Sequence, residues 1–245
     1  MNRLIAGIHP VREALRARQP LDKILIAKGA SSPRIQEVID LSRTACVPVR
    51  FEPRELLDRT CKGVSHQGVI AFGVAREYVE LNDVIPGAAL LVVLDGIEDP
   101  HNLGAIIRTA HAAGANAIVI PERRSAPLTE TVDRASAGAL EHLPVARVTN
   151  VSQTLERLKE NGFWIYGLDD QGAELYDRIE YSTPTAIVLG VEGNGLHKNV
   201  QKHCDLLVRI PMAGSVSSLN VSVAAGVVLF EWRRREASKL PRAGI

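Results

Sequence analysis

Long apolar runs and paired cysteines are the features that this 245-residue chain most clearly lacks. No apolar stretch approaches the ~20 residues that span a bilayer, and no charged leader with an apolar signal core opens the sequence. We therefore expect a cytoplasmic protein with no membrane partner. Cys46, Cys61 and Cys204 are odd in number and widely spaced, so they argue against a disulfide framework or a zinc site and favour buried free thiols.

A strong net charge is also missing, because 29 Lys and Arg balance 28 Asp and Glu. The distribution is uneven: residues 1–80 hold 13 basic and 9 acidic side chains, and residues 81–245 hold 16 and 19. A basic excess in the first part is compatible with phosphate contacts, and equally with an ordinary solvated surface. The 46% of apolar residues is ample for the core of one large domain or two modest ones.

Alternating strand and helix patterns predict an α/β protein in two parts. In the first part we expect helices at 11–17, 33–44 and 53–59 and strands at 23–26, 47–51 and 68–72. In the second we expect buried strands at 90–94, 117–120, 144–148, 164–168, 186–189 and 206–210. Helical patterns between these strands predict a mostly parallel sheet with helices on both faces. The expected domains are 1–76 and 88–245, joined by a polar linker at 77–87.

The first motif, at residues 94–110, reads LDGIEDPHNLGAIIRTA. It follows a buried strand, and its acidic turn leads to a helix that we expect to begin near Asn102. Asn102 and Arg108 lie six positions apart, so they do not stack on one helix face. They would meet if Asn102 lay in the loop before the helix. Read alone, Arg108 is an ordinary surface arginine and Asn102 a helix cap.

The second motif, at residues 186–196, reads AIVLGVEGNGL, a buried strand that runs into a glycine-rich turn with Glu192. Its glycines follow the order G-x-x-G-x-G. That order is neither the dinucleotide fingerprint G-x-G-x-x-G nor a Walker loop, which disfavours a nucleotide-dependent oxidoreductase. Glu192 either serves a ligand or bonds backbone amides of the turn.

The third motif, at residues 210–224, reads IPMAGSVSSLNVSVA. Pro211 ends an extended run, and a loop of small residues leads to Asn220 and Ser222, either of which can cap the helix that follows. Exposed backbone groups in such a loop suit a flat or polar ligand. A plain helix-capping connection is the alternative.

Together the three motifs resemble, in order and spacing, those of the SpoU (TrmH-type) RNA ribose 2′-O-methyltransferases. Residues 7–15 and 64–70 resemble the start and end of the family's N-terminal substrate-binding domain, and residues 136–139 match a further family element. The similarity covers nearly the whole chain and is greatest to the RlmB-type subgroup, which methylates a guanosine of bacterial 23S rRNA. It implies a parallel-sheet SPOUT domain with a deep trefoil knot, and a small N-terminal α/β domain resembling ribosomal protein L30e.

The resemblance also implies the site. It assigns S-adenosylmethionine as the cofactor, bound without a metal, largely by backbone groups of five residues: Leu189, Gly190, Ile210, Ser218 and Leu219. It assigns an activating role to Arg108, supported by Asn102, Glu192 and Asn220. Because a guanidinium stays protonated at pH 7, we interpret Arg108 as a positioning and charge-stabilising group, acting with an RNA phosphate as proton acceptor.

Further expectations concern partners. RNA, most simply 23S rRNA, is the expected substrate, and His66 and Gln67 either touch it or form a solvated strand edge. Residues 221–232 are apolar nearly all round, which, with the family resemblance, predicts a homodimer through the second domain. His9, His101 and His111 have no metal-ligand spacing and are interpreted as structural. The alternatives are a tRNA ribose 2′-O-methyltransferase and a non-catalytic RNA-binding or ribosome-assembly factor of the same fold.

Overall fold

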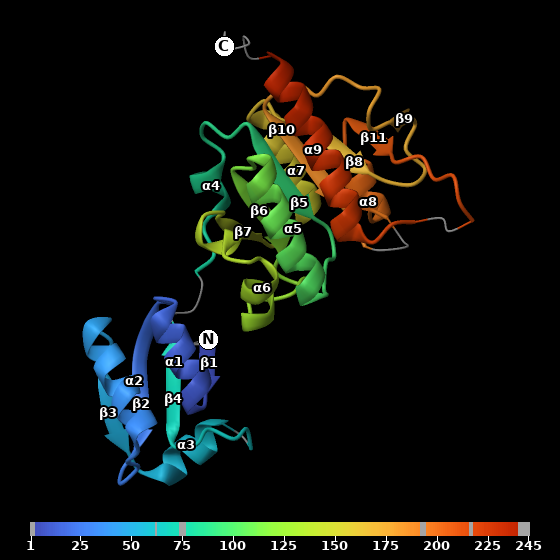
Figure 1. Cartoon of the computed structure of the whole chain (residues 1–245). Coiled ribbons are helices and arrows are strands. Elements are labelled where there is room, and N and C mark those ends of the chain that lie inside the picture. The colour runs from blue at the N-terminus through green and yellow to red at the C-terminus, as the bar shows by residue number, and fades with distance from the viewer. Residues whose placement is uncertain (1–2, 62, 74–76, 192–194, 216–217, 240–245) are drawn as a thin grey trace, which may run out of the picture. The chain divides into compact units, whose positions relative to one another are not determined.

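The computed structural model describes residues 3–61, 63–73, 77–191, 195–215 and 218–239 (Figure 1). The chain divides into two compact units, Met1–Glu77 and Tyr78–Ile245. Residues 78–87 of the linker expected at 77–87 lie in the second unit. Val79 N donates to Val145 O at 3.0 Å, and Leu128 N donates to the Tyr78 hydroxyl at 3.2 Å. The polar side chains of this segment lie on the exposed surface of the second unit and do not mark a flexible linker.

The first unit is a four-stranded sheet with helices on both faces. Its elements are β1 (Arg3–Ala6), α1 (Ile8–Arg16), β2 (Leu21–Ala27), α2 (Pro33–Thr44), β3 (Val49–Glu52), α3 (Arg54–Cys61) and β4 (Val69–Gly73). The strand order is β1-β4-β2-β3, in which only β2 and β3 run parallel. Helices α1 and α2 pack on one apolar face and α3 on the other. Strand β1 was not expected from the sequence; it pairs antiparallel with β4, a partner more than 60 residues away.

The second unit contains the remaining elements. They are α4 (Leu81–Val84), β5 (Leu90–Leu94), α5 (Pro100–Ala113), β6 (Ala117–Pro121), α6 (Glu130–Ala135), η1 (Ala139–Glu141), β7 (Val145–Val148), α7 (Val151–Glu160), β8 (Trp164–Leu168), β9 (Glu174–Leu175), β10 (Thr185–Leu189), α8 (Lys198–Gln201), β11 (Leu206–Arg209) and α9 (Val221–Lys239). The predicted parallel α/β fold is confirmed, since all paired strands of this sheet run parallel.

The order of the seven strands is β7-β6-β5-β10-β8-β11-β9. The chain builds outward from β5 to β7, crosses to the other side for β8, and then places β10 between β5 and β8. At this point the chain changes the side of the sheet to which it adds strands. In open parallel sheets, ligands bind at the carboxyl edge beside such a switch point. The carboxyl ends of β5, β8 and β10 therefore mark where a site is expected.

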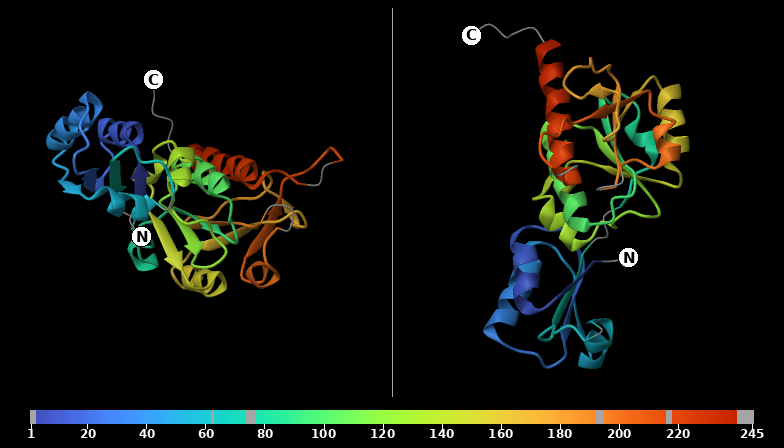
Figure 2. Two further views of the ribbon diagram at one scale, coloured as in Figure 1. Left: turned by 90° about the horizontal axis from the view of Figure 1, so that it is seen from below. Right: turned by 90° about the vertical axis from the view of Figure 1, so that its right-hand side faces the viewer.

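Two helical layers cover this sheet. Helices α5, α6 and α9 pack on one face, and α4, α7 and α8 on the other. Figure 2 shows α9 lying alongside α5. The two helices run parallel, because Asn102 near the start of α5 contacts Asn220 before α9, and Gly226 in mid-α9 faces Thr109. Both helices thus begin at the same edge of the sheet.

Local signals explain where α5 and α9 begin and end. Asp99 caps α5 by accepting from His101 N at 2.8 Å, Pro100 takes the first helical position, and Gly114 ends the helix at φ 87°. The prediction of a start near Asn102 was two residues late. Helix α9 continues to Lys239, well past residue 232, because Arg234 and Arg235 pair with Glu231 one turn earlier.

Candidate active site

A pocket lies at the carboxyl ends of β8, β10 and β11. All five residues that the resemblance assigned to the cofactor line it: Leu189, Gly190, Ile210, Ser218 and Leu219. The other described residues around it are Leu168, Asp169, Asp170, Val191, Gly195, Met212, Val221 and Ala224. The second motif follows β10 and the third follows β11, and only β8 separates these strands in the sheet. The pocket thus brings the two motifs together, although they lie about 20 residues apart in the chain.

The glycine turn of the second motif folds tightly back on itself. Val191 and Gly195 exchange two backbone hydrogen bonds of 3.0 Å. A Cβ atom on Gly190 would lie 2.1 Å from Gly195 O, a distance that no side chain tolerates. Gly190 is therefore required by a close approach of the Gly195 backbone, and both glycines line the pocket. Glu192, with Gly193 and Asn194, lies outside the described residues.

Asp169 is a site residue that sequence reasoning missed. Its carboxylate is buried directly after β8 and accepts from Leu196 N at 3.3 Å and from Gln201 Nε2 at 2.8 Å. These bonds hold the segment after the glycine turn against the end of β8. The available signal was an acidic residue immediately after a buried strand, a pattern that Asp95 repeats after β5.

The first and third motifs meet through their asparagines. Asn220 Nδ2 donates to Asn102 Oδ1 at 3.0 Å, and Asn220 Oδ1 accepts from Ser222 N at 2.9 Å. Asn220, not Ser222, is therefore the residue that caps α9. Asn102 sits in the first turn of α5, so it is neither the cap of this helix, which is Asp99, nor in the loop position from which it could meet Arg108.

Arg108 stands apart from these residues. It is exposed on α5, about 9 Å further along the helix axis than Asn102, and it does not line the pocket of its own chain. Within the described part of the chain, its guanidinium makes no hydrogen bond or ion pair. An exposed arginine with no internal partner is available for an anionic ligand.

His66 does not lie on a solvated strand edge. It is 4% exposed, its Nε2 contacts Asp58 Oδ1 at 2.7 Å, and its Nδ1 accepts from Gly68 N at 3.1 Å. Both ring nitrogens are used inside the first unit, so the solvated strand edge is wrong for His66, and its contact with RNA stays a prediction. Gln67 is exposed, with a left-handed backbone at φ 52°.

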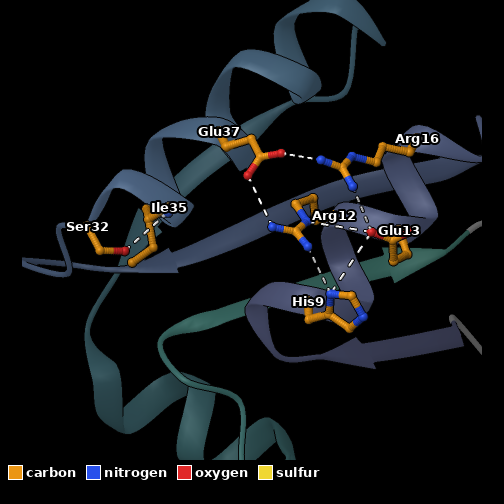
Figure 3. Close-up of polar contacts among 7 residues, drawn as sticks. All are labelled: His9, Arg12, Glu13, Arg16, Ser32, Ile35 and Glu37. Carbon is orange, nitrogen blue, oxygen red and sulfur yellow. Dashed lines mark hydrogen bonds and ion pairs between the residues drawn. The ribbon is translucent and has the colours of Figure 1, made fainter.

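The basic excess of the first unit is partly neutralised between α1 and α2 (Figure 3). Glu37 accepts from Arg16 at 2.6 Å and from Arg12 at 3.2 Å. Burial alone would raise the pKa of Glu37, but the hydrogen bonds and charges of Arg12 and Arg16 more than offset this, and its pKa is lowered. Two arginines of this unit are therefore already engaged with a carboxylate.

The thiols and histidines show no metal centre. In the described segments, no three His, Cys, Asp or Glu side chains are grouped so that they could hold a metal ion. All three cysteines are free, and Cys46 is exposed, contrary to expectation. Burial raises the pKa of the Cys204 thiol to about 12, so it is not a nucleophile at neutral pH. His111 stacks on His142 with ring centroids 5.5 Å apart.

None of the described helices is long and apolar enough to span a membrane.

Two family models match this chain. The model of the SpoU rRNA Methylase family matches residues 89–230, and the model described as RNA 2'-O ribose methyltransferase substrate binding matches residues 4–79. A putative TrmH family tRNA/rRNA methyltransferase of Bacillus subtilis (strain 168), YacO, is 44% identical over 237 residues, which are 94% of this chain and 95% of the relative.

Solved structures agree with these matches. The SpoU methyltransferase AviRb from Streptomyces viridochromogenes, crystallised in complex with the cofactor AdoMet, is similar with a TM-score of 0.72 at 28% identity, covering 97% of this chain and 91% of AviRb. The AdoMet-bound rRNA methyltransferase from Sinorhizobium meliloti is similar with a TM-score of 0.69 at 27% identity, covering 95% of this chain and 87% of that protein.

Proposed function

Because the chain belongs to the SpoU rRNA methylase family, we propose that it transfers the methyl group of S-adenosylmethionine to the ribose 2′-OH of a guanosine in bacterial 23S rRNA. One observation carries this proposal: the five residues assigned to the cofactor surround a single pocket at the carboxyl edge of the sheet. The substrate-binding model over residues 4–79 supports an RNA substrate. The expected location is the cytoplasm.

S-adenosylmethionine supplies an electrophilic methyl group when it is bound. The pocket suits such a ligand, since the tight glycine turn at Gly190 forms part of its wall and Ile210 and Leu219 line it. Leu189 and Ser218 complete the set. The chain's own task is to hold this ligand without water and to align it with the acceptor ribose.

Four residues are proposed to act on the acceptor. Arg108 positions the RNA and stabilises developing charge, while the bonded pair Asn102 and Asn220 orders the edge of the pocket. Glu192, outside the described residues, is proposed to support them. A guanidinium stays protonated at pH 7, so the proton acceptor is a different group.

A homodimer through α9 belongs to the same proposal. One side of this helix packs on the core, yet Val223 is 53% and Phe230 is 50% exposed. With half-buried Val227 between them, they form a stripe at helical spacings of four and three. An exposed apolar stripe of this kind supports pairing with a second copy of the chain.

We expect Phe230→Asp to weaken the dimer by about 30-fold or more, because it removes an aromatic anchor worth about 2 kcal/mol and places a charge in the interface. Light scattering across a concentration series measures this. Phe51→Asp is the matched control, since Phe51 is equally exposed (51%) but lies in the first unit. Val228 is not a useful test site, because it is fully buried within its own chain. An unchanged dimer in the Phe230 variant would contradict the α9 interface.

The knot and the L30e-like domain are also proposed. The placement of β10 between the earlier strands β5 and β8, followed by the two pocket loops, supports a trefoil knot in residues after β8. A four-stranded sheet with helices on both faces supports the likeness of the first unit to ribosomal protein L30e.

Two other functions use the same fold. One is a tRNA ribose 2′-O-methyltransferase, and the other is a non-catalytic RNA-binding or assembly factor. The resemblance of the extended N-terminal domain to that of the rRNA subgroup favours rRNA, although the matched substrate-binding model names only RNA. The pocket lined by all five cofactor residues favours catalysis. The test is a map of 2′-O-methyl groups on 23S rRNA and tRNA from cells with and without the protein. We expect one guanosine of 23S rRNA to lose its methyl group. A loss confined to tRNA supports the first alternative, and no loss at all supports the second.

A further inference from the structure

A second pocket adjoins the cofactor pocket. Its lining comes from the first motif and from the segment after the glycine turn, and it shares Val191 and Val221 with the first pocket. Asn102 and four ionisable residues line it: Glu98, Asp99, Arg124 and His197. This pocket thus combines polar and charged groups at the border of the first pocket.

His197 is held in this pocket by a buried carboxylate. Asp95, 6% exposed at the end of β5, accepts from His197 N at 2.9 Å and contacts His197 Nδ1 at 2.9 Å through the same oxygen, Oδ2. The side chain of His197 remains 43% exposed. The backbone bond alone would suffice to tie this segment to β5. The second bond does something further, because it fixes the direction of the ring.

The outer ring nitrogen of His197 is an acceptor. Arg124 Nη1 lies 3.3 Å from His197 Nε2, and a guanidinium can only donate. Nε2 therefore carries a lone pair, and Nδ1 carries the proton that Asp95 accepts. A neutral imidazole that a carboxylate orients through Nδ1, with its lone pair on the outward Nε2, is the arrangement that general bases use.

The backbone around this pair is specialised. Gly96 has φ 90°, and a Cβ there would lie 2.7 Å from Val191 Cγ2 and 3.4 Å from His197 Cε1. Arg124 adopts φ 58°, a left-handed conformation that is strained for a non-glycine residue. Strain of this kind persists where the surrounding structure imposes it, and it collects at functional sites.

We propose that the second pocket binds the acceptor nucleotide and that His197 Nε2 accepts the proton of its 2′-OH. This inference rests on the proposed methyl transfer. Arg124 leaves Nε2 when an RNA phosphate enters, because a phosphate is a stronger acceptor for a guanidinium than a neutral imidazole. His197 is thereby freed only when substrate is present.

The step balances as follows in atoms and electrons. The 2′-OH proton passes to Nε2, the 2′ oxygen forms a bond to the methyl carbon, and the methyl–sulfur bond breaks with its electron pair remaining on sulfur. The imidazolium that results keeps its Nδ1–H bond to Asp95, which stabilises the positive charge. Asp95 and Arg124 contact the ring of His197 directly, and Glu98 and Asp99 line the same pocket.

The first test needs no catalysis. Nitrogen-15 NMR of the full chain reports which ring nitrogen of each histidine carries the proton, and His197→Gln assigns the signal. We expect the Nδ1–H tautomer for His197 in the free protein and a change in its Nε2 signal when a transcript of 23S rRNA is added. An Nε2–H tautomer in the free protein overturns the proposal.

The second test measures methyl transfer from S-adenosylmethionine to the same transcript in single turnover. We expect His197→Gln to slow it by about 100-fold, the usual contribution of a general base, with unchanged heat of cofactor binding. The acidic limb of the pH–rate profile should disappear, and free imidazole should restore part of the rate to His197→Ala. His203→Gln is the control, because His203 bonds Asn199 O and Glu156 and lines neither pocket.

The outcomes separate the two proposals. A wild-type chain that methylates RNA together with an equally active His197→Gln variant overturns the role of His197 alone. A wild-type chain that binds S-adenosylmethionine but methylates neither 23S rRNA nor tRNA overturns the methyl transfer and this inference with it.

Discussion

Gly190→Ala is expected to raise the dissociation constant for S-adenosylmethionine by about 100-fold or more, equivalent to about 2.7 kcal/mol. The added Cβ would lie 2.1 Å from Gly195 O, 2.4 Å from Gly195 C and 2.6 Å from Leu196 N. All three atoms belong to the backbone, so no side-chain rotation relieves the clash. On the other side, β10 is paired with both β5 and β8 up to Leu189. The glycine turn, rather than the strand, has to move, and it forms one wall of the pocket.

Titration calorimetry measures this loss, with circular dichroism as the check that the variant is folded. Gly214→Ala is the matched control. Gly214 lies in the loop between Ile210 and Leu219, and a Cβ there meets no atom within 4 Å, so this variant should bind like the natural chain. If Gly190→Ala kept full affinity in a folded protein, the tight turn would not be part of the binding site.

Arg108→Ala is expected to reduce methyl transfer by about 1000-fold, the upper range for removing one group that stabilises charge in a transition state. Cofactor affinity should stay unchanged, because Arg108 does not line the cofactor pocket. Arg108→Lys should recover only part of the rate, since an ammonium ion retains the charge but not the planar fork that binds two phosphate oxygens.

Single-turnover transfer to an rRNA transcript, alongside calorimetry with the cofactor, separates these effects. Arg178→Ala serves as control because Arg178 is also exposed in the second unit, in the segment after β9, away from both pockets. Equal losses of rate and cofactor affinity in the Arg108 variant would mean that the residue supports the structure of the pocket instead of acting on the acceptor.

Local patterns in the sequence predicted most elements correctly. The strands Leu90–Leu94 and Trp164–Leu168 and the helix Pro33–Thr44 have the expected bounds. A strand buried on both faces needs a continuous apolar run, and a helix that begins with a serine cap and a proline carries its own start signal. These properties depend on neighbours within a few positions, so the sequence alone reveals them.

Other features depend on partners that are distant in the sequence. The segment 77–87 looks like a linker by composition, yet Val79 pairs with a residue of the second unit. His66 looks like a surface residue beside a turn, yet Asp58 and Gly68 enclose its ring. The apolar helix after Asn220 gave no indication of which face stays exposed, because its hydrophobic residues surround it almost evenly. In each case the decisive contact is tertiary.

The sequence by itself determined the alternation of buried strands and helices, the three motifs and the residue types that they offer. Only the tertiary structure decided which of these residues meet. Asn102 and Asn220 lie 118 positions apart, and Asp95 and His197 lie 102 apart, yet each pair is joined by a hydrogen bond. No periodic pattern reports such pairs. They form because β10 inserts between β5 and β8, which brings the carboxyl ends of strands from different parts of the chain to one edge of the sheet.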